Sequence, residues 1–393
     1  MRVCFLVTRL PVPPWRGDQV RAFHHLRVLA RRHDVTCCAL VPSAPDAAAA
    51  AAVEALGARL VIVPLGWLGA PLALARALVG DRTPLQVLLF RRARARARVG
   101  ALLAGGRFDV VHAQLVRTAP YLPGRGGPPV VLDFIDALST NFARRAAAER
   151  GPLGWVSRWE AARLRRFEPA LAARVARGLV VAAAERDAIG AGRIDVVPNG
   201  VDGAAFAFDA TPRARPRLVF SGNLGYFPNV DAAVWLADDV FPRVRAAVPD
   251  AELRLVGARP ARAVQALAGR PGISLAAAVP AMAPELAAAA VAMVPMRTGS
   301  GLQNKVLEAM AVGTPVVTTP PVAAAIDGAR PGEHLIVAED AAGLAAAAVG
   351  LLGDPARARA LARAARALVE RGYRWEDSAA GVERAWNAVT AGS

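Results

Sequence analysis

Lysine is almost absent from this sequence of 393 residues. Of its 48 Lys and Arg residues, only Lys305 is a lysine. A guanidinium is a planar, permanently charged fork, whereas an ammonium is a compact point charge, so the two are not interchangeable at every binding site. We therefore expect Lys305 at a position where arginine cannot replace it. The alternative is a chance survivor on the surface.

Long apolar runs are also missing, although 54% of the residues are hydrophobic. The runs at residues 3–7 and 60–63 have the length of buried strands and are too short to cross a membrane. The first run ends at Thr8 and Arg9 before a proline-rich turn, which argues against a secretory signal. These features predict a cytoplasmic protein without membrane-spanning helices.

Cysteine is scarce as well. Cys4, Cys37 and Cys38 lie in or beside expected strands, and they lack the spacing of metal ligands. Their odd number and their positions are typical of small core residues in a reducing compartment. We expect no metal site.

Acidic residues are underrepresented in the first half of the chain. Residues 1–200 contain 29 Arg and 14 Asp or Glu, a net charge of +15, whereas residues 201–393 have a net charge of +1. A basic field attracts phosphates, anionic lipids or nucleic acid, but solvated arginines from a GC-rich genome explain the charge equally well. Because aromatics total 6% and no recognised motif is present, a nucleic-acid-binding protein is the weakest interpretation.

The order of apolar runs and helical patterns indicates the fold class. Strand-like runs alternate with helix-like segments in both halves of the chain, which predicts parallel sheets covered by helices. We expect an α/β protein with two doubly wound domains. The main predicted strands are residues 2–8, 35–41, 60–64, 110–113, 130–134, 179–182, 218–221, 253–256, 291–295 and 316–318, and the main predicted helices are residues 18–32, 47–56, 231–244 and 302–312.

The domain boundary is predicted at IDVVPNGVD, residues 194–202, where a short strand meets Pro-Asn-Gly turn chemistry. We assign residues 1–195 to an N-terminal domain and residues 196–375 to a C-terminal domain. A last helix, residues 376–393, has Trp375 and Trp386 as aromatic anchors and is expected to cross back to the N-terminal domain.

Ligands of doubly wound domains bind at the carboxyl ends of the strands. The loop at residues 11–18, after the first strand, contains Gly17, which permits close backbone approach, and Asp18, the expected N-cap of the next helix. The helix amides favour an anion there, but a plain turn is the commoner meaning of a single glycine.

The loop after residue 295 is more informative because a glycine-rich segment joins a strand directly to a helix. Lys305 and Glu308 are three residues apart and share one helix face, about 4.5 Å apart along the axis. An ammonium in the first turn suits a diphosphate, and the carboxylate can accept hydrogen bonds from ribose hydroxyls. Both are expected to face a solvent-filled cleft; the alternative is a surface ion pair of little consequence.

The segment RTGSGLQNKVLEAMAVGTPVV, residues 297–317, resembles the donor-binding segment of family-4 retaining glycosyltransferases, and IDVVPNGVD resembles their linker. Residues 11–36, FDVVHAQ (108–114) and VFSGNLGYFPNVDAAVWL (219–236) resemble further parts of that family. The likeness extends over nearly the whole chain and is greatest to the sugar transferases of bacterial exopolysaccharide clusters. It implies the GT-B fold, with two Rossmann-like domains facing a cleft, and hexosyl transfer from a nucleotide-diphosphate sugar without a cofactor.

The resemblance also implies residue roles on the donor side. Glu308 would bind the donor ribose, and the loop 299–301 would lie against the diphosphate. Ser300 stands where relatives have a glutamate, and the loop 221–226 lacks their basic residues, so the donor sugar is left open. The implied donor-binding residues are Glu308, Ser300, Gly301, Asn304, Gly299, Gly17, Asn223 and Val279.

On the acceptor side, VVLDFIDALS has Ile135 where relatives often have a histidine. Asp136 is the first candidate for a contact with the acceptor hydroxyl or the transferred sugar, and Asp133 is the second; either could instead cap the following turn. His112 and Arg21 are further acceptor-side candidates, although a histidine at the end of a strand is more often structural.

Catalysis is assigned to Lys305, Asp136 and Arg297, with Lys305 and Arg297 neutralising the leaving diphosphate. The expected partners are a nucleotide sugar, a glycan or polyprenyl-phosphate-linked acceptor, and an anionic surface at the inner face of the plasma membrane, but no nucleic acid. A nucleotide-sugar epimerase would use the same donor site without an acceptor. A dinucleotide dehydrogenase fits poorly, because no G-x-G-x-x-G follows the first strand.

Overall fold

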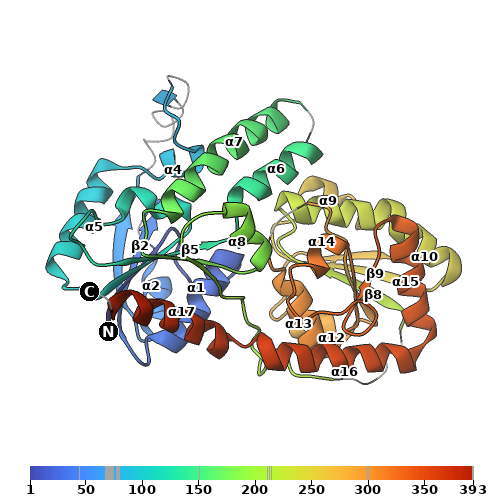
Figure 1. Ribbon diagram of the computed structural model, residues 1–393. Coiled ribbons are helices and arrows are strands. Elements are labelled where there is room, and N and C mark those ends of the chain that lie inside the picture. The colour runs from blue at the N-terminus through green and yellow to red at the C-terminus, as the bar shows by residue number, and fades with distance from the viewer. Residues whose placement is uncertain are drawn as a thin grey trace. The chain divides into compact units, whose positions relative to one another are not determined.

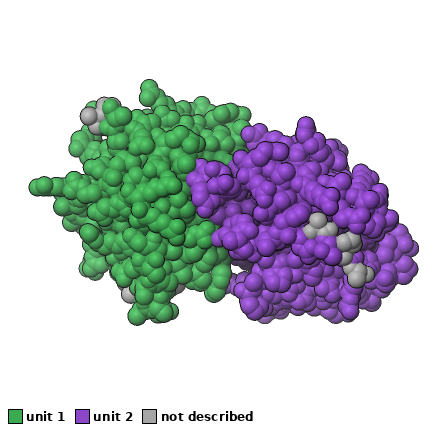
Figure 2. Space-filling view, turned by 90° about the horizontal axis from the view of Figure 1, so that it is seen from below, with its two compact units in different colours: residues 1–198, 378–393 green, residues 199–377 purple. Residues whose placement is uncertain are grey.

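The chain divides into two compact units (Figure 2). Unit 1 comprises Met1–Pro198 and Ser378–Ser393, and unit 2 comprises Asn199–Asp377. The computed structural model describes residues 1–43, 45–66, 75–76, 80–149, 151–209, 211, 213, 215–298 and 301–391.

Unit 1 is built on a parallel sheet of seven strands within the described residues, in the order β3-β2-β1-β4-β5-β6-β7. Successive side chains of a strand point to opposite faces of the sheet, so a strand that is apolar throughout indicates that both faces of the sheet are buried. In β1, Val3 and Phe5 enter one core, and Cys4 and Leu6 enter the other. The strands are β1 (Arg2–Val7), β2 (Asp34–Val41), β3 (Arg59–Pro64), β4 (Val110–Gln114), β5 (Val130–Ile135), β6 (Arg177–Val180) and β7 (Ile194–Val196).

Helices cover both faces of this sheet (Figure 1). The first core is closed by α1 (Gly17–Leu29), α2 (Ala47–Glu54) and α17 (Trp375–Thr390). The second core is closed by α4 (Leu85–Leu88), α5 (Ala93–Gly105), η1 (Val116–Tyr121), α6 (Leu138–Ala148), α7 (Pro152–Ala172) and α8 (Ala183–Ile189). The three cysteines are buried free thiols, as predicted for core residues.

The last helix belongs to unit 1 from Ser378 onward, which confirms that it crosses back. Trp386 is completely buried in the first core, and its Nε1 donates to Nδ1 of His112 at 3.1 Å. Ser378 Oγ donates to the carbonyl oxygen of Pro198 at 2.6 Å, so the start of the C-terminal segment of unit 1 is hydrogen-bonded to the end of its first segment.

Unit 2 contains a second parallel sheet, of six strands within the described residues, in the order β10-β9-β8-β11-β12-β13. Two edge strands were not predicted, β10 (Ile273–Ala276) and β13 (Ile336–Val337), because both are short and partly exposed, so no apolar run marks them. The other strands are β8 (Arg217–Ser221), β9 (Glu252–Val256), β11 (Val291–Val294) and β12 (Val316–Thr318).

The helices of unit 2 alternate with its strands (Figure 1). The predicted helix 231–244 is continuous but consists of α9 (Phe227–Trp235), a π-helical turn η2 (Leu236–Val240) and α10 (Phe241–Ala247). The remaining helices are α11 (Arg262–Gln265), α12 (Ala283–Ala287), α13 (Asn304–Val312), α14 (Pro320–Ala323), α15 (Ala341–Gly353) and α16 (Pro355–Gly372).

The strand order creates a switch point in each unit, between β1 and β4 in unit 1 and between β8 and β11 in unit 2. On either side of such a point the chain proceeds in opposite directions along the sheet. The loops that leave the carboxyl ends of the two strands therefore diverge and open a crevice in which ligands of α/β proteins bind. In unit 2 these are the loops that begin at Gly222 and Pro295.

Candidate functional site

The single lysine lies at the switch point of unit 2. Lys305 is the second residue of α13, and its Nζ donates to Oδ1 of Asn229 on α9 at 2.6 Å. The same Nζ lies 4.5 Å from the centroid of the Phe220 ring, at the end of β8. Lys305 is only 9% exposed, so it is not a chance survivor on the surface. Our prediction that it faces a solvent-filled cleft is also wrong, because the side chain is buried.

Two glycines allow the backbone to approach the ammonium. A Cβ added at Gly222 would lie 2.9 Å from Nζ of Lys305 and 2.9 Å from Nδ2 of Asn229. A Cβ at Gly257, after β9, would lie 1.6 Å from the carbonyl oxygen of Gly222. Both glycines have a positive φ, +147° and +151°, that side-chain-bearing residues rarely adopt. The loops after β8 and β9 are thus in direct contact beside Lys305.

The electrostatics of this site depend on burial. Burial lowers the pKa of Lys305 to about 7, and the nearby Glu308 carboxylate opposes the shift. Burial raises the pKa of Glu308 to about 7, and here Lys305 opposes the shift. The surface ion-pair interpretation is wrong, because the ammonium binds the neutral amide of Asn229 and no ion pair among the described residues joins it to Glu308.

An approaching anion would change this balance. A diphosphate beside Lys305 would favour its charged form and raise the pKa, since an opposite charge at short range stabilises the ammonium. The site can therefore bind negative charge at the point where the free helix amides of α13 also begin. Its chemistry is that of anion stabilisation.

Further donor-side candidates surround α13. Asn304, its first residue, accepts a hydrogen bond at 2.9 Å from Nδ2 of the buried Asn199, which follows the unit boundary. Gly301 precedes the helix, while Gly299 and Ser300 lie outside the described residues.

The other two donor-side residues lie in loops at the same edge of the sheet. Asn223 follows β8; its backbone oxygen accepts from Nδ2 of Asn229 at 2.9 Å. Val279 lies in the loop after β10 and is partly exposed. Their assignment to donor binding stays a prediction.

Arg297 has a partner of its own. Its Nη2 and Nε donate to the Asp231 carboxylate at 2.6 and 3.2 Å, and its guanidinium lies 4.7 Å from the centroid of the Trp235 ring. Its side chain is 48% exposed. The positive charge of Arg297 is therefore already paired with a carboxylate at hydrogen-bond distance, whereas no ion pair of Lys305 occurs among the described residues.

Three of the acceptor-side candidates form a buried network in unit 1. Arg21 Nε donates to Oδ2 of Asp133 at 2.6 Å and its Nη1 donates to the Val197 carbonyl at 3.0 Å. Arg21, Asp133 and His112 have no exposed surface, so an acceptor cannot reach them in this structure. Our assignment of these residues to acceptor contact is corrected on that ground: they connect α1, β4, β5 and the segment before the unit boundary.

His112 is fixed as a neutral ring. Burial lowers its pKa to about 4, despite the opposing attraction of Asp133. Its Nδ1 accepts from Trp386, so the ring proton is on Nε2, which lies 3.9 Å from Oδ2 of Asp133. The structural interpretation of this histidine is supported.

Asp136 lies at the carboxyl edge of unit 1, just beyond β5, and is partly buried. The residue before it, Ile135, has a φ of +67°, which is strained for a β-branched side chain, and the register of β5 with β6 shifts at this point. Strain of this kind is concentrated at functional sites. Asp136 thus stays the acceptor-side candidate.

The loop after β1 differs in detail from the prediction. Helix α1 begins at Gly17 with Arg16 as its N-cap, so Asp18 is not the N-cap. The carboxylate of Asp18 instead pairs with Arg9 across the loop. A Cβ at Gly17 would meet no atom within 4 Å, so neither packing nor a positive φ requires glycine there.

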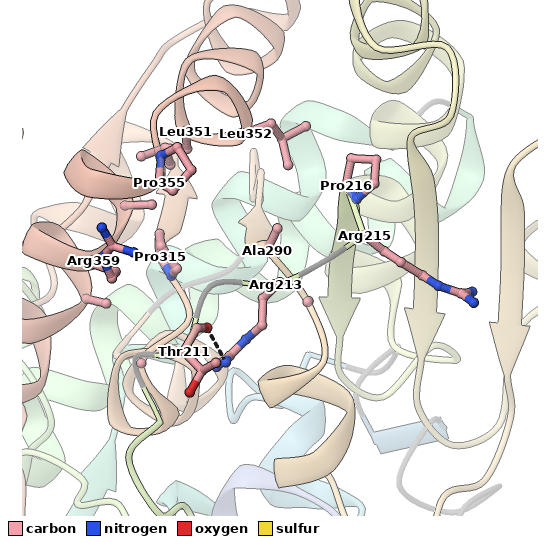
Figure 3. Close-up of a pocket in the computed structure, with 14 residues that line it drawn as sticks. Thr211, Arg213, Arg215, Pro216, Ala290, Pro315, Leu351, Leu352, Pro355 and Arg359 are labelled. Carbon is pink, nitrogen blue, oxygen red and sulfur yellow. Dashed lines mark hydrogen bonds between the residues drawn. The ribbon is translucent and has the colours of Figure 1, made fainter.

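A cavity of about 200 Å³ lies at the opposite edge of the unit 2 sheet (Figure 3). Pro216, Ala290 and Pro315, which immediately precede β8, β11 and β12, contribute to its wall. Because ligands of doubly wound sheets bind at the carboxyl ends of the strands, this cavity is not the candidate site.

Asn229, Phe220, Gly222 and Gly257 were missed as site residues. Asn229 and Phe220 lie within VFSGNLGYFPNVDAAVWL, the segment that we compared with the start of a donor domain. A Gly immediately after an apolar strand, as at Gly222 and Gly257, is the signal that could have found the other two.

Two parallel sheets, each covered by helices, give the chain an α/β architecture, and solved structures of similar architecture show that this is the GT-B fold. The match of unit 2 to a glycosyltransferase model identifies the protein as a transferase. Residues 215–354, which lie in unit 2, match the family model described as "Glycosyl transferases group 1". The chain thus contains a group 1 glycosyltransferase domain. A search of curated protein sequences found no match.

Solved structures of the same fold cover the whole chain. Sucrose-phosphate synthase from Thermosynechococcus elongatus has a TM-score of 0.73 and 18% identity, with 100% of both chains covered. Anabaena HepE, solved in complex with UDP and glucose, has a TM-score of 0.69 and 13% identity, with 99% of this chain and 100% of that chain covered. WaaG, a glycosyltransferase involved in lipopolysaccharide biosynthesis, has a TM-score of 0.65 and 17% identity, with 99% of each covered.

Among the described residues, no helix is long and apolar enough to span a membrane. Within the same part of the chain, no group of three or more His, Cys, Asp or Glu side chains is arranged to hold a metal ion.

Proposed function

We propose that this glycosyltransferase is a retaining, family-4 enzyme. It transfers a hexose from a nucleotide-diphosphate sugar to a glycan or polyprenyl-phosphate-linked acceptor during synthesis of bacterial exopolysaccharide or another cell-surface polysaccharide. It needs no cofactor and works in the cytoplasm, at the inner face of the plasma membrane. The observation that carries the proposal is the position of Lys305, a buried ammonium at the switch point of unit 2 that forms no ion pair with any carboxylate of the described residues.

The donor side of the mechanism follows from this position. Cleavage of the bond between the sugar and the diphosphate leaves negative charge on the leaving group. Lys305, the amides that begin α13 and the helix dipole are held in place before the reaction, so they stabilise that charge more in the transition state than in the ground state. Glu308, one turn later, accepts hydrogen bonds from the donor ribose, and Arg297 has a secondary role because Asp231 already engages it.

The acceptor side is assigned to unit 1. In a retaining transfer the acceptor hydroxyl approaches the face that the diphosphate leaves, forms the new bond to the sugar and gives its proton to the leaving phosphate. In this proposal Asp136 orients that hydroxyl; its position after the strained end of β5, at the carboxyl edge of the sheet, supports the assignment. Two of the structural neighbours support a carbohydrate substrate, since HepE was solved with UDP and glucose, and TarM with UDP and alpha-GlcNAc-glycerol.

Thermal stabilisation by a panel of nucleotide sugars and free nucleotides tests the donor assignment. A ligand at about 100 times its dissociation constant adds about 2.7 kcal/mol to the stability of the state that binds it. We expect one nucleotide diphosphate and its sugar to stabilise the parent and not the Lys305→Ala variant. Product analysis with donor alone separates an epimerase, which alters the sugar without an acceptor, from a transferase; lack of stabilisation by any member would contradict the proposal.

A further inference from the structure

An apolar tip protrudes from unit 1 where α7 begins. Leu153, Trp155 and Val156 are 63%, 73% and 49% exposed, and they occupy the first turn of this helix. Isolated exposed apolar residues are common, but three large ones in a single turn are not explained by the packing of unit 1. We define the apolar tip as these three residues.

The shape of the hairpin holds the tip outward. Helices α6 and α7 lie side by side (Figure 1), and Gly154 makes their approach possible, because a Cβ there would lie 2.3 Å from the carbonyl oxygen of Glu149. The Glu149 carboxylate accepts from Oγ of Ser157 at 3.1 Å and from Nε of Arg145 at 2.9 Å. The hydrogen bonds at the start of α7 are thus made toward the end of α6, while the apolar side chains of the first turn of α7 stay exposed to solvent.

The charges of α7 are divided between its two faces. Its two acidic residues are buried: Glu160 accepts from the backbone N–H groups of Leu85 and Gln86, and Glu168 accepts from that of Ser139. The outer face that continues from the tip carries Arg158, Arg165 and Arg166, all exposed. An apolar turn followed by a surface with only positive charge complements an anionic bilayer.

We propose that the apolar tip of α7 inserts into the surface of an anionic phospholipid bilayer, while Arg158, Arg165 and Arg166 contact the lipid phosphates. Trp155 sits at the boundary between headgroups and acyl chains, where an indole is favoured, and the positive end of the α7 dipole lies at the same level. The inference rests on the membrane contact in the proposed function and identifies the residues that make it. It does not depend on sugar transfer.

Flotation of the full chain with vesicles tests the proposal. We expect recovery with vesicles of equal parts phosphatidylglycerol and phosphatidylcholine, and little with phosphatidylcholine alone. The variant Leu153→Ser/Trp155→Ser/Val156→Ser should bind the anionic vesicles at least about tenfold more weakly, since binding scales with buried apolar area. Each of Arg158→Gln, Arg165→Gln and Arg166→Gln should weaken binding about fivefold.

Matched variants distinguish specific insertion of the apolar tip from nonspecific hydrophobic binding to the vesicles. Leu89→Ser removes a lone exposed leucine of unit 1, 37% exposed, and should leave vesicle binding unchanged. Trp155→Phe should retain most of it. Equal recovery of parent and tip variant, or of anionic and neutral vesicles, would overturn the proposal, as would a parent dimer that the tip variant abolishes without any vesicle binding. Nucleotide stabilisation, measured on the same variants, reports on the donor site independently.

Discussion

At the scale of single residues, the proposed function rests on one ammonium that is costly to bury. Lys305 is held by a neutral amide, beside an aromatic ring and a glycine backbone, and has no carboxylate partner among the described residues. A planar guanidinium is larger than an ammonium, so we expect arginine to disturb the contacts with the Phe220 ring and the Asn229 amide. This explains why a chain that otherwise uses arginine retains lysine at this position.

Removing either charge of the pair should abolish most transfer at donor concentrations that are not saturating, through kcat for Lys305 and through donor binding for Glu308. We expect Lys305→Ala to lower kcat about a hundredfold or more, because it deletes a group that stabilises the leaving diphosphate. Glu308→Ala should chiefly weaken donor binding, and Lys305→Arg should not restore the rate. Steady-state kinetics with the stabilising donor measures this, and Arg330→Ala, an exposed arginine of unit 2, is the control. Unchanged turnover in Lys305→Ala would remove the site assignment.

The same pair predicts a dependence of stability on pH. The pKa of Glu308 is raised in the folded state from 4.5 to about 7, so its stabilising contribution is present below pH 4.5 and is lost as the pH rises through about 7. The pKa of Lys305 is lowered from 10.5 to about 7, so its contribution is present above pH 10.5 and is lost as the pH falls through about 7. The summed contribution of the two side chains to folding stability is therefore smallest near pH 7.

Comparison with Lys305→Met/Glu308→Gln isolates this effect. The Tm of the parent minus that of the variant should pass through a minimum near pH 7 and rise towards both acid and alkaline pH. Differential scanning fluorimetry of both proteins across this range measures the difference. A flat difference would show that the two side chains are solvated rather than buried.

The glycines beside Lys305 provide a test of packing. Gly257→Ala should destabilise unit 2 by roughly 2 kcal/mol or more, because its Cβ would lie 1.6 Å from the carbonyl oxygen of Gly222 at a φ of +151°. Gly350→Ala should do the opposite and add up to about 1 kcal/mol, since Gly350 is helical, within α15, with no atom within 4 Å of its added Cβ. Urea denaturation measures both, and a tolerated Gly257→Ala would contradict the close approach of the two loops.

At the scale of elements, α17 is an integral part of the first core of unit 1. Trp386 has no exposed surface, and its indole N–H donates a hydrogen bond to His112. The buried ion pair between Arg21 and Asp133 connects helix α1 to strand β5 of the same unit. Residues that looked like acceptor contacts thus stabilise the scaffold that positions Asp136.

Truncating the tryptophan of α17 should therefore destabilise unit 1. We expect Trp386→Ala to cost about 3–5 kcal/mol, through the loss of buried contacts and the cavity that remains. Trp155→Ala, at the exposed tip of α7, is the matched control and should change stability by less than about 0.5 kcal/mol. Urea denaturation followed by circular dichroism gives both values; equal effects would mean that α17 is not part of the core.

At the scale of the whole molecule, the two units carry different parts of the chemistry. Lys305, Asn229, Gly222 and Glu308 all belong to unit 2, whereas the positive charge of the chain and the apolar tip belong to unit 1. In the proposed function, donor binding is thus assigned mainly to unit 2, and attraction to an anionic surface is assigned to unit 1.

Calorimetry should resolve this division. We expect two unfolding transitions. The nucleotide that binds the donor site should raise mainly one of them, because Lys305 and Glu308, its main proposed contacts, lie in unit 2. Trp386→Ala should lower only the other. The nucleotide and the variant together should move the transitions in opposite directions. If either perturbation shifts both transitions equally, the units unfold as one cooperative body and the assignment by unit fails.

Local patterns in the sequence predicted the strands and helices well. Buried parallel strands are continuous apolar runs and amphipathic helices repeat every three to four residues, so both can be recognised without knowledge of their neighbours. The loop before Lys305 could be found for the same reason, since it follows an apolar run directly. The edge strands β10 and β13 were missed because their burial is incomplete.

The sequence by itself thus determined the α/β class, the alternation of elements and the candidate loop. Only the tertiary structure decided that Asn229, 76 residues away, receives the Lys305 ammonium, and that Arg21, Asp133 and His112 are buried. The physical reason is that strand order, not sequence distance, brings loops together at the edge of a parallel sheet. Burial and partners depend on that order, which the alternation of strands and helices does not specify.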